Sequence, residues 1–489
     1  MARSDDAAEK AFPTFPKLAD QAGLSPSIDG RLRETGGWRN KRKWAGVLLA
    51  GLIAGHMAWN VWASVTLNRE LASVRAQGQP LRITEMAPPP VPDAQNAAVI
   101  YLEAGSALDL TNEEKSRLRA VSMTGHGSRG AAAYLYRDSR QIASDDALLA
   151  RNRKAVALVR QAAAMPQCRF PIDYDAENLA AIPLKHLAVL RQLAGLMRIQ
   201  AAAEARRSMT DDALDDVGTV FRMSDALARE PIVMSGLVSM VIQRVGYGAL
   251  ADVLAASALT PPQAARALHL LPASDPGAMV IRDLQAERTF GLWAFGYVRA
   301  RPWNAGSLSG SVAPNSAWPY RMLTRLAMVV WSPWMKMDEV YYLRHINETL
   351  KAAVRTPFTT LSEAQFGDGI ASVPKYAVVA RIMSPAFTNA LTIRDRCLVD
   401  RSLAEAAIAL SAYRAANGRY PDQLETAAVA SGMPAPVDLY TGAPLRYRDG
   451  GDTFTLYSVG KDRKDDGGVA GKGNSARADD AGDIVWPGV

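Results

Sequence analysis

The feature that most constrains this chain is an uncharged apolar segment near its beginning. Residues 44–65 read WAGVLLAGLIAGHMAWNVWASV and contain no Asp, Glu, Lys or Arg. At 1.5 Å per residue, a helix of this length is about 33 Å long, enough to cross a hydrocarbon layer of about 30 Å. The sequence therefore predicts a single N-terminal transmembrane helix over residues 44–65, with the lipid bilayer as its partner.

Basic residues before this segment predict its orientation. The cations concerned are Arg31, Arg33, Arg39, Lys41, Arg42 and Lys43, against Glu34 alone. Positive charge beside the first hydrophobic segment keeps that flank in the cytoplasm. We therefore expect residues 1–43 to be a basic cytoplasmic tail, and the segment to be an uncleaved, single-pass signal anchor. The rest of the chain would then be periplasmic, at the bacterial inner membrane.

A cleaved signal peptide is the alternative, because Val61-Trp62-Ala63 resembles a cleavage site. The long leader and the long apolar core argue against it. Gly51 and Gly55 form a GxxxG pair, a pattern that lets two membrane helices approach closely. This pattern makes a homodimer through Gly51 and Gly55 a possible arrangement, although glycine is also common in membrane helices that do not pair.

Composition limits the class of the remaining chain. With 48% hydrophobic residues, the 489-residue chain is too apolar to be disordered, and its mean hydropathy of -0.07 is too low for a polytopic membrane protein. Much of the formal net charge of +7 comes from the basic tail. No basic stripe interleaved with aromatic residues occurs elsewhere, so we expect no nucleic-acid partner. The two cysteines, Cys168 and Cys397, could form one disulfide or remain two buried thiols.

Helical patterns fill the middle of the chain. Residues 66–92 read as a stalk and a Pro-rich linker, and residues 93–375 as a helical domain. We expect Asp93 to cap the first helix of this domain, and Thr260 followed by Pro261 to start a later one.

A long apolar stretch within this domain, residues 231–257, is interrupted by Gln243 and Arg244. We therefore expect a buried helix there and not a second membrane span.

The helical domain carries no recognisable catalytic motif. Its histidines, His126, His186, His269 and His345, are far apart, and none has the HExxH spacing of a zinc site. The acidic pairs Asp211/Asp212 and Asp215/Asp216 are expected at a helix start and on its polar face. Acid–base catalysis by such pairs would require partial burial in a cleft.

The C-terminal region reads as a small α+β domain over residues 377–489. A long helix over 377–417 is expected to end at Asn417-Gly418, and Asp449-Gly450-Gly451 separates two β-branched and aromatic runs as in a hairpin. The expected fold class is therefore mainly α, with a single N-terminal transmembrane helix, a multi-helix extracytoplasmic domain and this small C-terminal α+β domain of a long helix plus an antiparallel sheet.

Several motifs of this region resemble one family. They are Tyr413, Asn417-Gly418-Arg419-Tyr420-Pro421, the turn from Asp438 to Leu445, Tyr447 and the run from Leu456 to Asp462. Over about the last ninety residues they resemble the C-terminal half of the major pseudopilin of type II secretion. That family places its apolar helix directly before the head, whereas here the apolar segment ends at residue 65. The chain is therefore not expected to be a fibre subunit.

The resemblance implies a calcium site in the last loop. In the family this loop holds the ion through Asp carboxylates and backbone carbonyls, and the matching positions are Asp462, Asp466, Asp480 and Asp483. Calcium takes about six to eight oxygen ligands, and glycines let carbonyls turn inward. Arg463 stands where the family favours Gly, and added lysines dilute the negative charge. A solvated, mixed-charge tail is the alternative.

Residues 78–104 also resemble the start of membrane-anchored helical proteins of bacterial envelopes. The sequence thus favours a non-catalytic envelope protein with a calcium-stabilised pseudopilin-like head that contacts a protein partner, in a secretion or pilus-like apparatus. The alternatives are an extracytoplasmic enzyme with an unrecognised site in the helical domain, and a membrane-linked spacer. A polar cleft with shifted pKa values would favour the enzyme.

Overall fold

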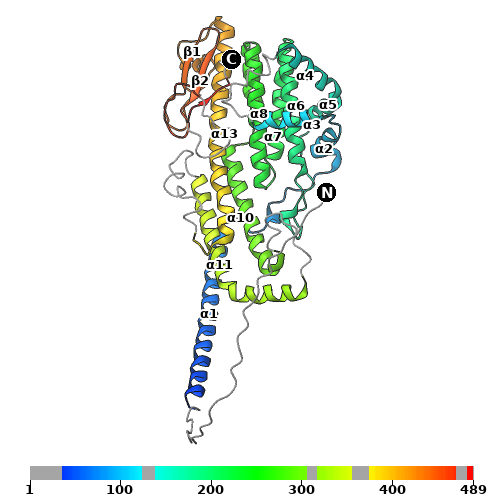
Figure 1. Ribbon diagram of the computed structural model, residues 1–489. Coiled ribbons are helices and arrows are strands. Elements are labelled where there is room, and N and C mark those ends of the chain that lie inside the picture. Colours follow the sequence, from blue (N-terminus) through cyan, green and yellow to red (C-terminus); the bar gives the residue numbers. More distant parts are fainter. Residues whose placement is uncertain (1–35, 124–137, 305–316, 355–373, 470–481, 488–489) are drawn as a thin grey trace, which may run out of the picture. The chain divides into compact units, whose positions relative to one another are not determined.

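A computed structural model describes residues 36–123, 138–304, 317–354, 374–469 and 482–487. Within these ranges the chain is mainly helical, with one small antiparallel sheet near the C-terminus (Figure 1). The expected mainly α class and the C-terminal sheet are confirmed. The chain forms two compact units, Met1–Ala58 and Trp59–Val489.

The elements follow one another along the chain in a simple order. The helices are α1 (Gly36–Ala76), α2 (Ala97–Ser106), α3 (Asn112–Met123), α4 (Ser139–Arg151), α5 (Arg153–Ala163), α6 (Lys185–Arg206), α7 (Thr210–Leu227), α8 (Val233–Ala256), α9 (Pro261–Leu270), α10 (Pro276–Ala300), α11 (Trp318–Val354), α13 (Val378–Asn417) and α14 (Leu424–Ala430). The strands are β1 (Arg446–Asp449), β2 (Phe454–Ser458) and β3 (Ile484–Val485), ordered β1-β2-β3.

Local capping signals set several of these boundaries. Thr260 forms a capping box with Gln263 at the start of α9, as its sequence predicts. Gly418 ends α13 with a φ of 74°, in the left-handed region that glycine adopts without strain. The expected cap at Asp93 is wrong. Asn96 caps α2 instead, because its side chain accepts a hydrogen bond from the amide of Ala98 at 3.1 Å.

Three helices in the described part of the chain are long and apolar enough to cross a membrane. They lie within Lys41–Ala76, Leu179–Arg206 and Val233–Ala256. Their most apolar stretches are 0%, 44% and 83% buried, respectively. Length and composition alone therefore do not select one span, whereas burial separates α1 clearly from α8.

The part of α1 from Trp59 onward packs against α11. Leu67 is buried there against Val340 and Leu343. The segment that follows α1 is held by Arg288 of α10, a fully buried residue whose guanidinium donates to the side chain of Gln79 at 2.5 Å. This end of α1 is therefore an integral part of the helical body.

Close helix packing in the body depends on glycines of α8. A Cβ on Gly246 would lie 2.5 Å from the ring of Phe221 on α7, and one on Gly248 would lie 2.6 Å from the guanidinium of Arg198 on α6. These glycines let α8 approach both neighbours closely. Tyr247, between them, is buried in the core.

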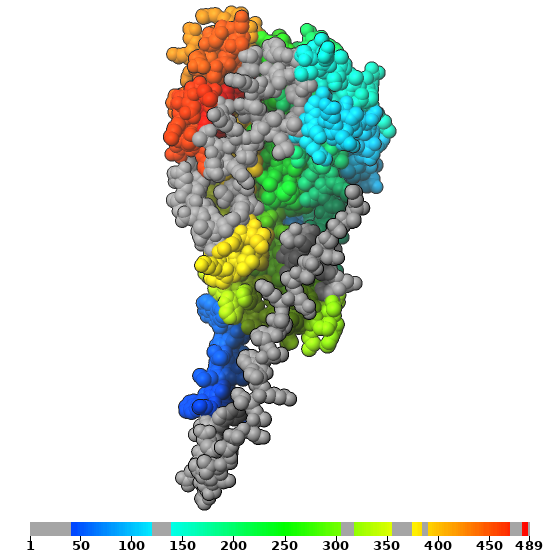
Figure 2. All heavy atoms as spheres, viewed as in Figure 1, coloured from blue at the N-terminus to red at the C-terminus, as the bar shows by residue number. Residues whose placement is uncertain are grey.

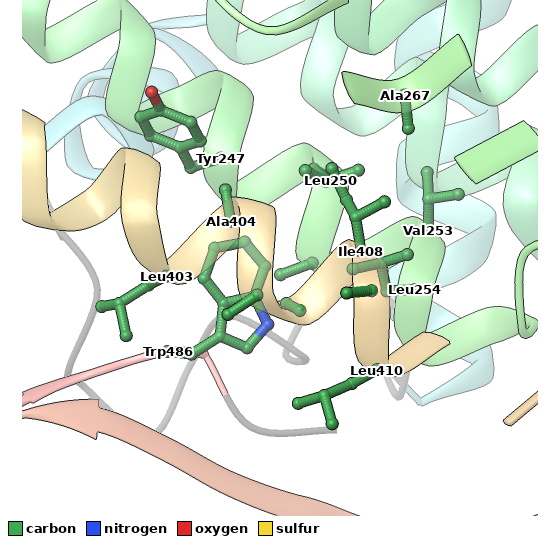
Figure 3. Packing of buried hydrophobic residues seen from close by; sticks show 14 of the residues in the cluster. Tyr247, Leu250, Val253, Leu254, Ala267, Leu403, Ala404, Ile408, Leu410 and Trp486 are labelled. Carbon is green, nitrogen blue, oxygen red and sulfur yellow. The ribbon is translucent and has the colours of Figure 1, made fainter. Parts of the chain in front are cut away.

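One hydrophobic cluster joins the helical body to the C-terminal sheet. It contains residues of α6 to α9, of α13 and α14, and of the strands. Figure 3 shows the indole of Trp486, just after β3, beside Leu403 and Ala404 of α13. Trp486 is 1% exposed. Helix α13 therefore has one continuous core with the α8 side of the body and with the sheet.

Contacts from distant segments fix both ends of this C-terminal region. The carboxylate of Asp338 on α11 accepts the amides of Val379 and Ala380, at 2.9 and 3.1 Å, and so caps the start of α13. In the sheet, β1 and β2 pair antiparallel with Tyr447 opposite Leu456. The expected hairpin at Asp449-Gly450-Gly451 is confirmed.

Candidate functional site

The candidate site is the acidic loop that joins β2 to β3. It leaves the sheet after Gly460 and returns at Gly482, next to the paired residues Ser458 and Ile484. A Cβ on Gly460 would lie 2.7 Å from the carbonyl oxygen of Gly482, and Gly460 has a φ of +74°. Only glycine fits this close approach, so the two ends of the loop are held together. The middle of the loop, residues 470–481, lies outside the described residues.

Asp483 is firmly positioned by the backbone of this loop. Its carboxylate accepts the amides of Gly468, at 2.7 Å, and Asp466, at 3.4 Å. Burial raises the pKa of the Asp483 carboxyl above its usual range, and the nearby carboxylates of Asp465 and Asp466 raise it further. A bound cation would relieve this repulsion.

The other predicted ligands have different surroundings. Asp466 is exposed, and its backbone amide lies against Asp483. The carboxylate of Asp462 accepts the amide of Lys464 at 3.2 Å, across a turn in which Arg463 has a φ of 57°. That left-handed geometry is the physical reason why a glycine suits position 463. Asp480 lies outside the described residues.

The loop fits a hard cation in its donor chemistry. Two predicted ligands are neighbours along the loop, since the backbone amide of Asp466 donates to the carboxylate of Asp483. In the part of the chain with described coordinates, no group of three or more His, Cys, Asp or Glu side chains is arranged as a metal site.

Two carboxylates, one in the loop and one next to it, have structural partners that were not predicted. Asp465 accepts the hydroxyl of Tyr457 at 2.8 Å and pairs with Arg446 at 3.2 Å. The hydrogen bonds from Tyr457 and from the Gly467 amide hold the pKa of Asp465 below its usual range. These partners tie the loop to the outer face of β1 and β2. No sequence signal relates Asp465 to Arg446, because they belong to separate segments.

The second is Asp438, which is buried behind β2. It accepts the hydroxyl of Ser458 at 2.9 Å and the amides of Val459 and Tyr440 at 2.8 and 2.9 Å. Asp438 therefore fixes the chain just before Gly460. The sequence could have indicated this role, because Asp438 begins the turn that resembles the family and Asp side chains in turns commonly accept hydrogen bonds from nearby backbone amides.

The prediction that Asp215 and Asp216 both lie on a polar helix face is wrong for Asp216. Asp216 is fully buried and not on the polar face, whereas Asp215 is exposed and pairs with Arg266. Arg160 donates to both oxygens of Asp216 at 2.7 Å and to Glu204 at 2.7 Å. Burial raises the pKa of Asp216 to about 7, and the neighbouring Glu204 contributes to the rise. Arg160 thus covers a pair of carboxylates between α5, α6 and α7.

A second polar cluster surrounds Glu230. His186 lies 3.2 Å from its carboxylate through Nε2, and Ser235 donates to the same oxygen. A nucleophilic relay would need the serine hydroxyl to bond to the imidazole, which this arrangement does not provide. Burial raises the pKa of the nearby Cys168 to about 12, with Glu230 adding to the effect, so its thiol stays protonated near neutral pH.

The two cysteines do not form a disulfide in this structure. Cys168 and Cys397 are both free thiols, the first partly buried and the second fully buried. They pack in different hydrophobic clusters. The interpretation as two separate buried thiols is the one that this structure supports.

The chain was also compared with known proteins. No protein-family model matches it, and neither a curated protein nor a solved structure does so.

Proposed function

We propose that the protein is a membrane-anchored, non-catalytic protein of the bacterial envelope, with α1 as its single span and its body on the periplasmic side. The observation that carries this proposal is the exposure of α1. Trp44, Leu48 and Leu52 are 68%, 66% and 72% exposed. The competing helices α6 and α8 both bury many of their residues within the body. Such an apolar surface is favourable in lipid and unfavourable in water.

Protease treatment of spheroplasts tests this topology. With a tag on the N-terminus, we expect added protease to degrade the body while a tagged fragment of the basic tail and α1 survives. The reason is that the cations before residue 44 retain the tail in the cytoplasm. A cytoplasmic marker protein that stays intact is the control for sealed cells. A body that resists protease until lysis would contradict the proposal.

The polar clusters of the body support a non-catalytic role. The buried carboxylates of Asp216 and Glu230 are bonded to Arg160 and to His186 with Ser235, respectively. These contacts match those of structural ion pairs in a helical core. Because burial keeps the Cys168 thiol protonated, this thiol is a poor nucleophile.

A protein partner is proposed for the head, the region from α13 to the C-terminus. Strand β1 lies at one edge of the sheet and is largely exposed. An edge strand of this kind can add a strand from another protein. The sequence resemblance to pseudopilins supports a partner in a secretion or pilus-like apparatus. The GxxxG spacing of Gly51 and Gly55 supports pairing of two copies through α1.

The head is further proposed to bind calcium through Asp462, Asp466, Asp480 and Asp483. We expect the full chain in detergent to melt at a higher temperature in calcium than in chelator, because an ion that binds only the folded state stabilises it. At a hundredfold excess over Kd this stabilisation is about 2.7 kcal/mol. The full chain is needed because α13 has its core in common with α8 and α9.

A matched pair of variants makes the calcium test specific. Asp466→Asn should abolish most of the calcium-dependent shift, since Asp466 is exposed and its loss leaves the loop hydrogen bonds in place. Asp452→Asn, in the exposed hairpin turn, should retain the full shift. Asp483 is a poorer choice, because its carboxylate also holds two loop amides. Superimposable melting curves in calcium and chelator would contradict the metal site.

A further inference from the structure

The first part of α11 is an apolar helix that the body barely covers. Residues 318–331, which we call the surface segment, read WPYRMLTRLAMVVW. Its large apolar side chains are 50% to 74% exposed, namely Trp318, Tyr320, Met322, Leu323, Leu326, Val329, Val330 and Trp331. A soluble protein rarely exposes so many large apolar side chains on one helix. The segment therefore needs an apolar environment outside the body.

The two arginines of the surface segment lie on one side of the helix. Arg321 and Arg325 both lie over the ring of Trp303, at 5.7 and 4.9 Å from its centroid. Thr324 and Met328, which share that side by helical spacing, are the partly covered residues of the segment. The opposite side contains Leu323, Leu326 and Val330, which are 57% to 65% exposed.

The surface segment ends where α1 would leave the bilayer. Pro333 lies inside α11, two residues after the surface segment, and a proline in a helix interior kinks the helix. Figure 1 shows a lime-coloured helix across the lower end of the body. Beside Pro333 the rings of Trp334 and Trp59 lie 4.2 Å apart. Lys336 donates to Asn60 at 2.8 Å, and Ser332 donates to it at 3.1 Å.

Trp59 and Asn60 belong to the segment predicted to span the membrane, residues 44–65. Their contacts with Ser332, Trp334 and Lys336 hold the C-terminal end of the surface segment near the outer end of this predicted span. Figure 2 shows the lime-coloured part of the chain at the surface of the body. The occupant next to its apolar side is therefore the same bilayer that α1 crosses.

We propose that the surface segment lies in the outer interface of the bilayer, with Leu323, Leu326 and Val330 at the boundary between headgroups and acyl chains. At about 21 Å the helix is too short to span the membrane. It contains two arginines and no acidic residue, a charge that suits anionic phosphate headgroups. The proposal rests on the membrane anchor proposed above and adds a second contact with lipid.

Spin labelling of the full chain tests this contact. The chain, with Cys168 and Cys397 replaced by Ala, is placed in vesicles of phosphatidylethanolamine and phosphatidylglycerol. A nitroxide is attached at Leu326→Cys, and collisions with oxygen, which prefers lipid, and with a nickel chelate, which stays in water, are measured. We expect a label depth of about 5–10 Å below the headgroup boundary. Val330→Cys is the second variant, should Leu326→Cys lower the melting temperature.

Two reference positions separate the possible outcomes. Leu52→Cys reports on α1, and Val429→Cys, 78% exposed on α14, reports on water. If Leu326→Cys behaves like Val429→Cys while Leu52→Cys is in lipid, the surface-segment proposal alone is overturned. Shielding from both reagents would mean coverage by a second copy or another protein, which also overturns it. If Leu52→Cys is in water, the membrane anchor fails first.

Discussion

Replacing Trp486 by Ala is expected to lower the free energy of unfolding by about 3–5 kcal/mol, the usual loss for a buried Trp or Phe replaced by Ala. The indole is 1% exposed and packs with Leu403 and Ala404 of α13 in the cluster that joins the head to the body. The backbone amide of Trp486 also donates to the carbonyl of Leu456 at 2.8 Å. Removal of the side chain therefore leaves a cavity between the sheet and α13.

Urea unfolding followed by circular dichroism of the full chain in detergent measures this loss. Val429→Ala is the control in the same domain, because Val429 is 78% exposed, and we expect a change within about 0.5 kcal/mol. The Trp486 variant should also lose part of its calcium-dependent shift, since the loop ends next to β3. Equal stability of the Trp486 and Val429 variants would show that the C-terminal tail is not part of the core.

The second large effect is expected at Arg160. Arg160→Met keeps the apolar stem but removes the guanidinium that binds Asp216 and Glu204. At pH 8 this leaves two buried carboxylates without their cation, a change that typically costs about 3–5 kcal/mol. Arg207→Met, at an exposed pair with Asp146, should cost less than about 1 kcal/mol.

The Arg160 effect should depend on pH with a definite sign. In the unaltered chain burial raises the pKa of Asp216 to about 7, against an ordinary value of about 3.9. Between these values the folded chain binds more protons than the unfolded chain, so this group lowers stability as pH rises. Without the guanidinium the pKa of Asp216 rises further. The penalty of Arg160→Met should therefore grow from pH 5 to pH 8, and a penalty independent of pH would contradict the assignment.

Short-range signals in the sequence predicted much of the fold. Gly418 ends α13 because only glycine readily adopts its φ of 74°. Thr260 and Pro261 start α9, and Asp449-Gly450-Gly451 forms the hairpin turn. Each of these features depends on residues within one or two turns of each other. Local backbone preferences were therefore sufficient to locate them.

Features that depend on distant partners could not be predicted in the same way. Asp338 caps α13 from another helix, and Asn60 bonds to Lys336, which lies far along the chain. Asp216 was expected on a polar face because an acidic neighbour, Asp215, precedes it. Asp216 is buried against Arg160 of α5, and the spacing of residues within α7 cannot predict a partner on another helix.

The calcium ligands of the candidate loop stay a prediction. The family-like ending of the sequence named Asp466 and Asp483, and in the structure the backbone amide of Asp466 donates to the carboxylate of Asp483. The engagement of Asp465 with Tyr457 and Arg446 was not predicted, because it depends on which residues of β1 and β2 face the loop. A sequence motif can thus indicate which carboxylates belong to one loop. The other side chains that bind these carboxylates, such as Tyr457 and Arg446, are known only from the structure.

The shared core of α8, α9, α13 and Trp486 also restricts when this protein can fold. Residues near position 250 reach their final packing only after residue 486 has been synthesised, so the order of synthesis and the order of packing differ. Long-range closure of this kind is slow and leaves apolar surface open in the meantime. Prematurely terminated chains would lack the closing residues entirely, which gives proteolytic quality control a physical basis for distinguishing them from finished molecules.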